Sequence, residues 1–112
     1  MSALWHNPRC SKSRQALALL QDRGEEVAIR RYLDEVPSEA ELRAAATAMG
    51  IGPRDMIRRG EAAYRELGLK DAGDDALFAA MAAHPKLIER PVFFRDGRAV
   101  LGRPPERVLD LL

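Results

Sequence analysis

The chain has 112 residues, fewer than the ~150 of an average domain, so we expect one domain without separate catalytic and regulatory parts. Its composition, 46% hydrophobic and 31% charged, argues against a disordered, collagen-like or coiled-coil chain. The net charge of +1 gives no general attraction for nucleic acid or an acidic membrane. The longest apolar run, residues 76–83, is far shorter than the ~18 residues that cross a bilayer. Because the N-terminus also lacks a signal-peptide apolar region, we expect a cytoplasmic protein with no nucleic-acid or membrane partner.

The first third of the chain predicts a βαβ unit. Residues 3–5 form a short apolar strand, and a helical pattern begins soon after Cys10 and ends at Gly24. Residues 27–29 form a second strand. Strand, helix and strand within about thirty residues predict two parallel strands with a right-handed crossover. The buried stripe of the helix is expected to consist of Ala16, Leu17 and Leu20.

The middle of the chain predicts four helices. The first begins at a capping box of Ser38 and Glu41 and ends at Gly50. The other three are expected over residues 53–57, 61–67 and 74–84. The apolar positions expected to be buried are Leu42, Ala45, Met49, Met56, Ile57, Leu77, Phe78 and Met81.

The last segment predicts a β-hairpin followed by a helix. The apolar runs 92–94 and 99–101 flank Asp96-Gly97, which is a strong signal for a type I′ turn. A closing helix is expected after Pro104-Pro105, with Val108, Leu109 and Leu112 buried.

This order of elements predicts an α/β fold with a thioredoxin-like mixed β-sheet, built from a βαβ half and a ββα half with a helical insert between them. We expect the thioredoxin-like core at about residues 1–33 and 86–112, and the helical insert at about residues 36–84, within a single domain of residues 1–112.

Cys10 is the single cysteine and lies where a strand gives way to a helix. A helix N-terminus and nearby Lys or Arg lower the pKa of a thiol, because both stabilise the thiolate. Free backbone N–H groups at that helix end, together with the hydroxyls of Ser11 and Ser13, form a site for an anion. The alternative is an inert buried cysteine. The polar, basic surroundings favour a reactive thiol beside an oxyanion pocket.

The spacing around Cys10 narrows the thiol chemistry. One cysteine excludes an internal disulfide and every multi-cysteine metal site. Ser13 stands where the second cysteine of a C-x-x-C motif would be, so the chain cannot carry out dithiol exchange on its own. A phosphatase loop would need an arginine at position 16, which is Ala16, and two histidines are too few for a metal site without carboxylates. We therefore expect no bound metal, and a resolving thiol supplied by another molecule.

Four segments resemble the glutaredoxin-linked arsenate reductases. They are H-N-P-R-C-S-K-S-R at residues 6–14, M-G-I-x-x-R-x-x-I-R at 49–58, H-P-x-L-I-x-R-P at 84–91 and G-R-P-x-E-x-V-L-D at 102–110. They follow the order of that family over nearly the whole chain, with similar gaps, so the resemblance is far more specific than a lone cysteine motif.

The resemblance implies an oxidoreductase of arsenic detoxification, a glutaredoxin-dependent enzyme that reduces arsenate to arsenite. In that family the cysteine attacks arsenate, three arginines hold the oxyanion, glutathione adds to the arsenic adduct and glutaredoxin resolves the product. In this chain the nucleophile falls on Cys10 and the arginines on Arg58, Arg90 and Arg103. Guanidinium groups suit this role because they bind tetrahedral oxyanions through paired hydrogen bonds. The implied partners are arsenate, glutathione as co-substrate and glutaredoxin, with no bound cofactor, and we expect a monomer.

Some details stay open at this stage. Arg59 is an alternative to Arg58 as the anion-holding residue. His6 is either a substrate-site residue that tunes the thiolate or only the end of a strand, and Ser13 is expected to hydrogen-bond the thiolate or the anion. The resemblance also implies a cis peptide bond before Pro91.

Two other functions remain. Related folds include regulators, so the chain is alternatively a redox-sensing regulatory or binding module, although such regulators usually keep a C-x-x-C pair. A glutathione-dependent monothiol oxidoreductase with another substrate is the third possibility, because fold does not fix function.

Overall fold

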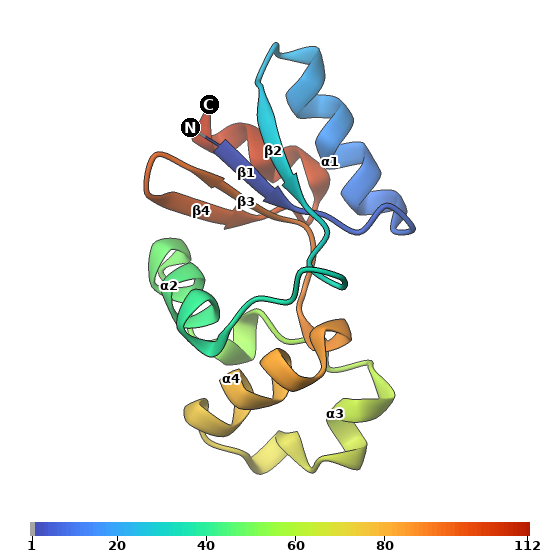
Figure 1. Ribbon diagram of the computed structural model, residues 1–112, viewed down its shortest axis with the longest axis vertical. Helices are drawn as coiled ribbons and strands as arrows, with labels where there is room; N and C mark the ends of the chain where they lie inside the picture. Colours follow the sequence, from blue (N-terminus) through green and yellow to red (C-terminus); the bar gives the residue numbers. More distant parts are fainter. Residues whose placement is uncertain (1) are drawn as a thin grey trace. The chain divides into compact units, whose positions relative to one another are not determined.

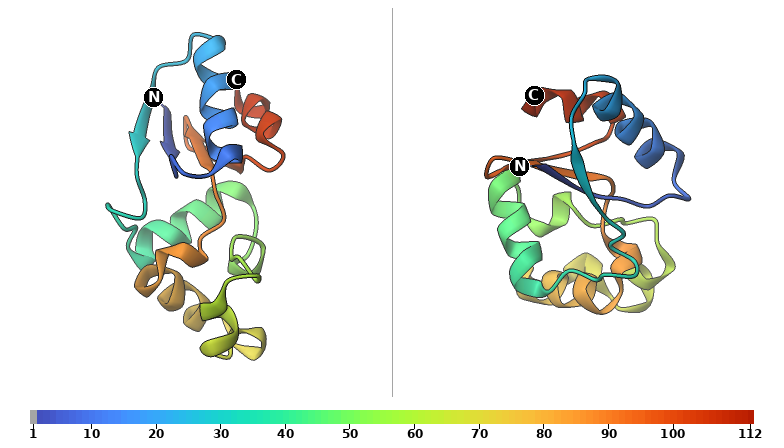
Figure 2. Two further views of the ribbon diagram at one scale, coloured as in Figure 1. Left: turned by 90° about the vertical axis from the view of Figure 1, so that its right-hand side faces the viewer. Right: turned by 45° about the horizontal axis from the view of Figure 1, so that its top comes forward.

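The computed structural model describes residues 2–112, and its contacts divide the chain into two compact units (Figures 1 and 2). The first unit comprises the chain up to Glu35 and from Arg90 to Leu112, and the second comprises Val36–Glu89.

The first unit contains a four-stranded mixed sheet. Its strands are β1 (Ser2–Trp5), β2 (Val27–Arg30), β3 (Val92–Arg95) and β4 (Arg98–Leu101). They lie in the order β2-β1-β3-β4, with β1 parallel to β2 and antiparallel to β3, and with β3 antiparallel to β4. The helix α1 (Ser11–Asp22) connects β1 to β2, so the predicted βαβ half and the hairpin of the second half are both confirmed.

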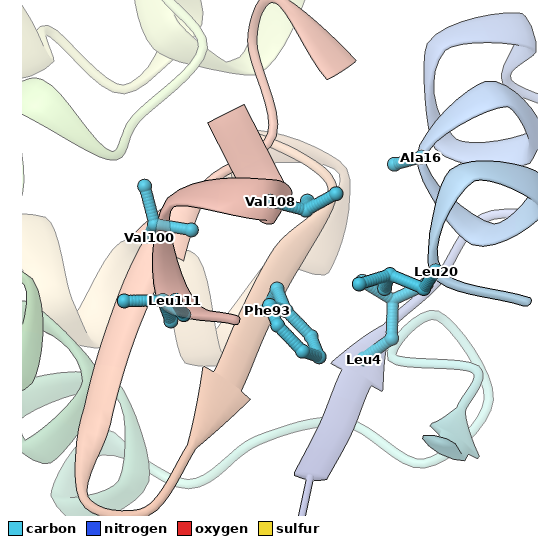
Figure 3. Close-up of a cluster of buried hydrophobic side chains, with 7 residues drawn as sticks. All are labelled: Leu4, Ala16, Leu20, Phe93, Val100, Val108 and Leu111. Carbon is cyan, nitrogen blue, oxygen red and sulfur yellow. The ribbon is translucent and has the colours of Figure 1, made fainter. Parts of the chain in front are cut away.

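The core of this unit lies between the sheet, α1 and a 3-10 helix, η4 (Pro105–Leu111) (Figure 3). Side chains from all three parts meet there because strand residues two apart, and helix residues three or four apart, share one face. The cluster consists of Leu4, Ala16, Leu20, Phe93, Val100, Val108 and Leu111. The opposite face of the sheet carries Trp5 against Phe94, with ring centroids 4.9 Å apart.

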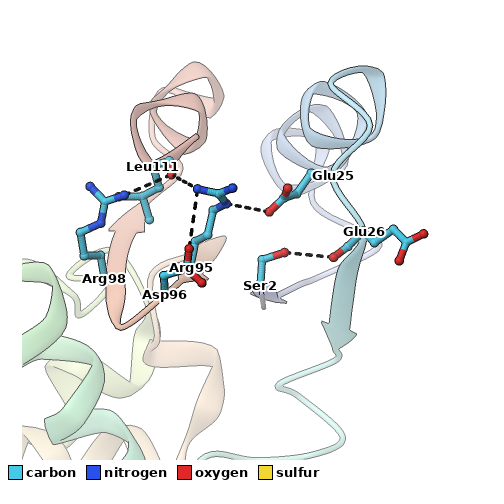
Figure 4. A network of polar contacts seen from close by, with 7 residues as sticks. All are labelled: Ser2, Glu25, Glu26, Arg95, Asp96, Arg98 and Leu111. Carbon is cyan, nitrogen blue, oxygen red and sulfur yellow. Dashed lines mark hydrogen bonds and ion pairs between the residues drawn. The ribbon is translucent and has the colours of Figure 1, made fainter.

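The hairpin turn has the backbone that its residues predict. Asp96 and Gly97 both have positive φ, at 52° and 80°, which matches a type I′ turn. The hairpin is held to the start of β2 and to the C-terminal turn by Arg95, whose Nε lies 3.0 Å from Glu25 Oε2 and whose Nη1 donates to the Leu111 carbonyl at 3.0 Å (Figure 4). Arg98 donates to the same carbonyl.

Two sequence expectations about the first unit need correction or extension. The closing segment is a 3-10 helix whose buried residues are Pro105, Val108 and Leu111, whereas Leu109 is only partly buried and Leu112 is exposed. The reason is geometric: a 3-10 helix has three residues per turn, so positions 108 and 111 lie in line. The peptide bond before Pro91 is cis as expected, and the bond before Pro104 is cis as well.

The second unit is helical. Its helices are α2 (Glu39–Met49), α3 (Ala62–Glu66) and α4 (Asp74–Ala83), and its 3-10 turns are η1 (Pro53–Asp55), η2 (Leu69–Asp71) and η3 (Pro85–Leu87). The capping box is present, with Ser38 Oγ accepting from Glu41 N–H and Glu41 accepting from Ser38 N–H. Arg54 ties the turns together by donating to Tyr64 Oη, to the Leu69 carbonyl and to the Ala72 carbonyl.

Two expectations in this unit are wrong in detail. The helix expected over 53–57 is only a 3-10 turn, after which Ile57 forms an antiparallel bridge with Ile88. In α2, Ala46 is buried and Met49 only partly. Among residues 2–112, no helix is long and apolar enough to cross a membrane.

Candidate active site

Cys10 lies at the junction predicted for it, as the N-cap residue of α1. After β1 the chain turns at Asn7, whose carbonyl accepts from Cys10 N–H at 3.0 Å and whose Oδ1 accepts from Arg9 N–H at 3.0 Å. The Cys10 carbonyl then accepts from Arg14 N–H, as the first hydrogen bond of the helix. The thiol is therefore held by a short, hydrogen-bonded turn at a helix N-terminus, where the peptide dipoles favour negative charge.

The surroundings of the Cys10 thiol favour its ionised form. Burial by itself raises the pKa of this thiol. The Ser13 backbone N–H, the Arg90 guanidinium and the Lys12 backbone N–H together outweigh that effect, so the pKa lies below its ordinary value. Cys10 is also partly exposed. A partly accessible thiol with a lowered pKa is the arrangement of a nucleophilic cysteine.

The Arg90 guanidinium lies beside the Cys10 sulfur and has nitrogens that make no hydrogen bond within the described residues. Its Nε and Nη1 are buried and have no hydrogen-bond partner among residues 2–112. Leaving buried donors unpaired costs about 1–3 kcal/mol each unless a ligand or solvent accepts from them. An oxyanion next to the sulfur would accept from such donors with charge-assisted hydrogen bonds.

Arg103 is brought to the Arg90 segment by the hairpin. Its Nη1 donates to the Arg90 carbonyl at 3.3 Å, and Gly102 N–H donates to the Pro91 carbonyl at 2.9 Å. Gly102 is required for this approach, because a Cβ there would lie 2.8 Å from Pro91 Cγ. Two arginines thirteen positions apart in the sequence are thus linked in space.

His6 and Ser13 lie on either side of Cys10 in the sequence, and their side chains form a buried pair. His6 Nδ1 lies 2.6 Å from Ser13 Oγ, which also accepts from Asn7 N–H at 3.1 Å. Burial lowers the pKa of His6, and the charges of Arg31 and Arg14 lower it further. From the sequence, Ser13 is expected to hydrogen-bond the thiolate or the anion. In the structure its backbone N–H acts on the thiol, and its hydroxyl holds the turn to His6.

Arg58 belongs to the second unit and is fixed there by two carboxylates. Its Nη1 lies 2.8 Å from Glu61 Oε1, and its Nε lies 3.5 Å from Glu89 Oε1. The backbone beside it is held by Arg58 N–H donating to the Leu87 carbonyl and by Glu89 N–H donating to the Met56 carbonyl. Arg58 Nη2 has no partner among the residues that the structure describes.

Sequence reasoning did not identify Glu61 and Glu89 as the partners of Arg58. Glu61 follows Arg58 by three positions, which is a usable signal, but Glu89 is 31 positions away. The alternative residue, Arg59, is exposed and donates to the Arg54 carbonyl at 3.3 Å. Between residues 2 and 112, no group of three or more His, Cys, Asp or Glu side chains is placed to hold a metal ion.

The first unit has a thioredoxin-like fold and carries a partly exposed thiol of lowered pKa beside the Arg90 guanidinium. The model of the ArsC family matches residues 5–111, and the chain belongs to the ArsC family.

Similar proteins cover almost the whole chain. An arsenate reductase of Neisseria meningitidis serogroup B is 44% identical, over 97% of this chain and 96% of its own length. The structure of an arsenate reductase from Vibrio cholerae has a TM-score of 0.97 and 49% identity, covering 99% of this chain and 97% of that one. A putative arsenate reductase from Yersinia pestis has a TM-score of 0.93 at 42% identity, covering 98% and 99% of the two chains.

Proposed function

We propose that the chain is an arsenate reductase in which residues 1–112 act as one functional domain and Cys10 is the nucleophile. The observation that carries this proposal is the contact between a thiol of lowered pKa and an arginine with two buried, unpartnered nitrogens. A thiolate supplies the attacking electron pair, and the unused N–H groups suit a tetrahedral anion bound next to it. The close relatives named arsenate reductase support arsenate as that anion.

The first step joins the Cys10 sulfur to arsenic. The thiolate gives its electron pair to the arsenic atom of arsenate, an S–As bond forms, and the bond from arsenic to one hydroxyl breaks as that hydroxyl takes up a proton and leaves as water. Arg90 and Arg103 stabilise the negative charge on the remaining oxygens. Removing one preorganised donor from such a site commonly costs about 3–4 kcal/mol of transition-state stabilisation.

The reduction itself needs two thiols. A glutathione thiol adds to the arsenic atom of the Cys10 adduct, a second S–As bond forms, and a second hydroxyl takes up the thiol proton and leaves as water. A glutaredoxin thiolate then attacks the glutathione sulfur, an S–S bond forms between them, and the electron pair of the broken S–As bond reduces arsenic to As(III); water replaces Cys10 on arsenic, which releases arsenite and restores the thiol. Both donors belong to a reducing compartment, so we propose that the enzyme works in the cytoplasm without a bound cofactor.

The other predicted residues have distinct proposed roles. Arg58 is proposed as the third anion-holding arginine because the family resemblance implies it, and within its own unit Glu61 and Glu89 fix its guanidinium. His6 and Ser13 are positioning residues, since their side chains bond to each other and to the turn that carries Cys10.

A coupled assay tests the proposal. Oxidation of NADPH is followed in the presence of glutathione, glutathione reductase and glutaredoxin while the arsenate concentration is varied. We expect saturable, arsenate-dependent turnover by the wild type and none by Cys10→Ser. Arg90→Ala and Arg103→Ala should each lower kcat/KM by about 10²–10³.

Arg107→Ala is a matched control, because Arg107 lies four residues beyond Arg103 and forms an exposed ion pair with Asp110 at 3.8 Å. It should keep wild-type kinetics. Absence of arsenate-dependent turnover by the wild type would refute the proposed activity. Wild-type kinetics of Arg90→Ala and Arg103→Ala would refute the arginine assignment alone.

A further inference from the structure

The strand β2 forms an open edge of the sheet. His6 N–H donates to the Arg30 carbonyl at 2.8 Å, so the backbone groups of Arg30 and Ala28 face β1. Because these directions alternate along a strand, the N–H and C=O groups of Val27 and Ile29 point away from the sheet. No other strand among residues 2–112 pairs with them. Ile29 is 47% exposed, which is unusual for an isoleucine in a strand.

The two ends of β2 carry charges of opposite sign. The sequence over residues 25–31 is E-E-V-A-I-R-R, with acidic residues before the strand and basic residues after it. Glu25 is engaged by Arg95 at 3.0 Å. Glu26 is exposed, and its side chain points away from the other residues drawn in Figure 4. An antiparallel copy of the same strand would present the opposite charge at each end.

The backbone pattern permits that pairing in one matching register. When Ala28 lies opposite Ala28 of a second copy, Val27 faces Ile29 of that copy, and both present outward N–H and C=O groups. The two symmetric Val27–Ile29 pairs then exchange four hydrogen bonds. Glu26 lies opposite Arg30 of the second copy in the closely spaced type of cross-strand pair, where side chains approach most.

The side chains agree with this register. Val27 packs on the core side of the sheet, so by alternation Ile29 shares that side, and each would cover its counterpart's apolar surface. Glu26 and Arg30 share the other side, where the Arg30 guanidinium lies 5.8 Å from the centre of the Trp5 ring and its Nε donates to the Glu35 carbonyl at 2.9 Å. Shifting the register by two residues would remove the Glu26–Arg30 pairs.

The other sheet edge lacks these properties. In β4, Ala99 and Val100 are buried, at 8% and 9% exposure. Arg98 begins β4 and Arg103 follows it, so both ends of this strand carry positive charge, with Arg95 nearby in β3. The acidic residue Asp96 lies in the turn. Two copies paired there would bring like charges together, which is destabilising in a β-ladder.

We propose that two copies of this chain associate through their β2 strands, in antiparallel register about Ala28, to form a symmetric dimer with a continuous eight-stranded sheet. This differs from the monomer expected from the sequence. Two short strands cover less than the ~1,200–2,000 Å² of a stable interface, so the dimer forms reversibly and is populated at high protein concentration.

Sedimentation velocity at protein concentrations from roughly 10 μM to 1 mM tests the proposal. The wild type should show an average mass that rises toward twice the chain mass. Glu26→Arg places arginine opposite arginine, and Arg30→Glu places glutamate opposite glutamate, so each variant should dimerise at least roughly tenfold more weakly than the wild type. Glu66→Arg, an exposed charge reversal at the end of α3, is the matched control and should dimerise like the wild type.

A mixture of the two variants provides the decisive result. In a mixed dimer the arginine introduced at position 26 of one chain faces the glutamate introduced at position 30 of the other. The unchanged Arg30 of the first chain faces the unchanged Glu26 of the second, so both pairs attract again. An equimolar mixture of Glu26→Arg and Arg30→Glu should therefore recover wild-type association.

Circular dichroism of each variant confirms that the fold is kept. A wild type that stays monomeric at the highest concentration, or variants that dimerise like the wild type, would overturn the proposal, as would a mixture that fails to associate.

Discussion

Replacing Gly102 with alanine tests the close approach that joins the two arginine-bearing segments. The added Cβ would lie 2.8 Å from Pro91 Cγ and 3.0 Å from Val108 Cγ1. Carbon atoms pack best about 3.5–4.0 Å apart, so the chain has to move by about 0.5–1 Å. Overpacking of this kind costs about 1–3 kcal/mol, and the stiffer unfolded chain offsets about 0.4–1 kcal/mol of it. We expect the free energy of unfolding to fall by about 1–2 kcal/mol.

Urea unfolding followed by circular dichroism measures this loss, which should also lower Tm by about 4–8 °C. The arsenate KM should rise as well, because the hydrogen bonds from Gly102 N–H to Pro91 and from Arg103 to Arg90 are displaced together. Gly52→Ala is the control: nothing lies within 4 Å of its Cβ position and its φ is −92°. If Gly102→Ala is as stable as Gly52→Ala and keeps the wild-type KM, the close approach does not support the site.

Three further predictions concern the thiol, the buried pair and the helical unit. Arg90→Ala should raise the pKa of Cys10, so the pH profile of iodoacetamide alkylation should move to higher pH. Arg90→Lys keeps a positive charge and should move the profile less. An unchanged profile in both variants would show that Arg90 does not act on the thiol. Because the pKa of His6 is lowered in the folded chain, the unfolded chain takes up the His6 proton at higher pH than the folded chain does. The free energy of unfolding should therefore fall as the pH drops below about 6.5. His6→Gln should flatten that dependence in urea titrations between about pH 5 and 7. Arg54→Met removes three hydrogen bonds from a charged donor and should lower the free energy of unfolding by about 2–4 kcal/mol, a loss that Arg59→Met, with one exposed hydrogen bond, should not reproduce in thermal denaturation.

The local signals in the sequence predicted most of the fold. Asp96-Gly97 determines the hairpin because the turn needs two residues with positive φ, and Ser38 with Glu41 determines the start of α2 because each satisfies the backbone N–H of the other. The sequence does not distinguish the 3-10 helix of the closing segment from an α-helix, because over seven residues the two present nearly the same apolar pattern.

Contacts between distant positions could not be predicted from local pattern. The bridge of Ile57 with Ile88 shortens the expected helix, yet its partner lies 31 positions away. At the site, the position of Cys10 at a helix N-terminus follows from the strand–turn–helix pattern. The choice of Arg90 and Arg103 among 15 arginines came only from the family resemblance, since charge and spacing alone do not separate them from the other arginines.

The hairpin of β3 and β4 has a consequence for engineering the enzyme. Arg90 and Arg103 lie just outside its open end, whereas Asp96-Gly97 closes it beyond the paired rows from Val92–Leu101 to Arg95–Arg98. Those three steps span roughly 10 Å of extended chain. A peptide tag or fluorophore attached at the tip would therefore extend into solvent without changing the distance between the Arg90 and Arg103 segments. The tip is thus a suitable attachment point for a reporter of turnover.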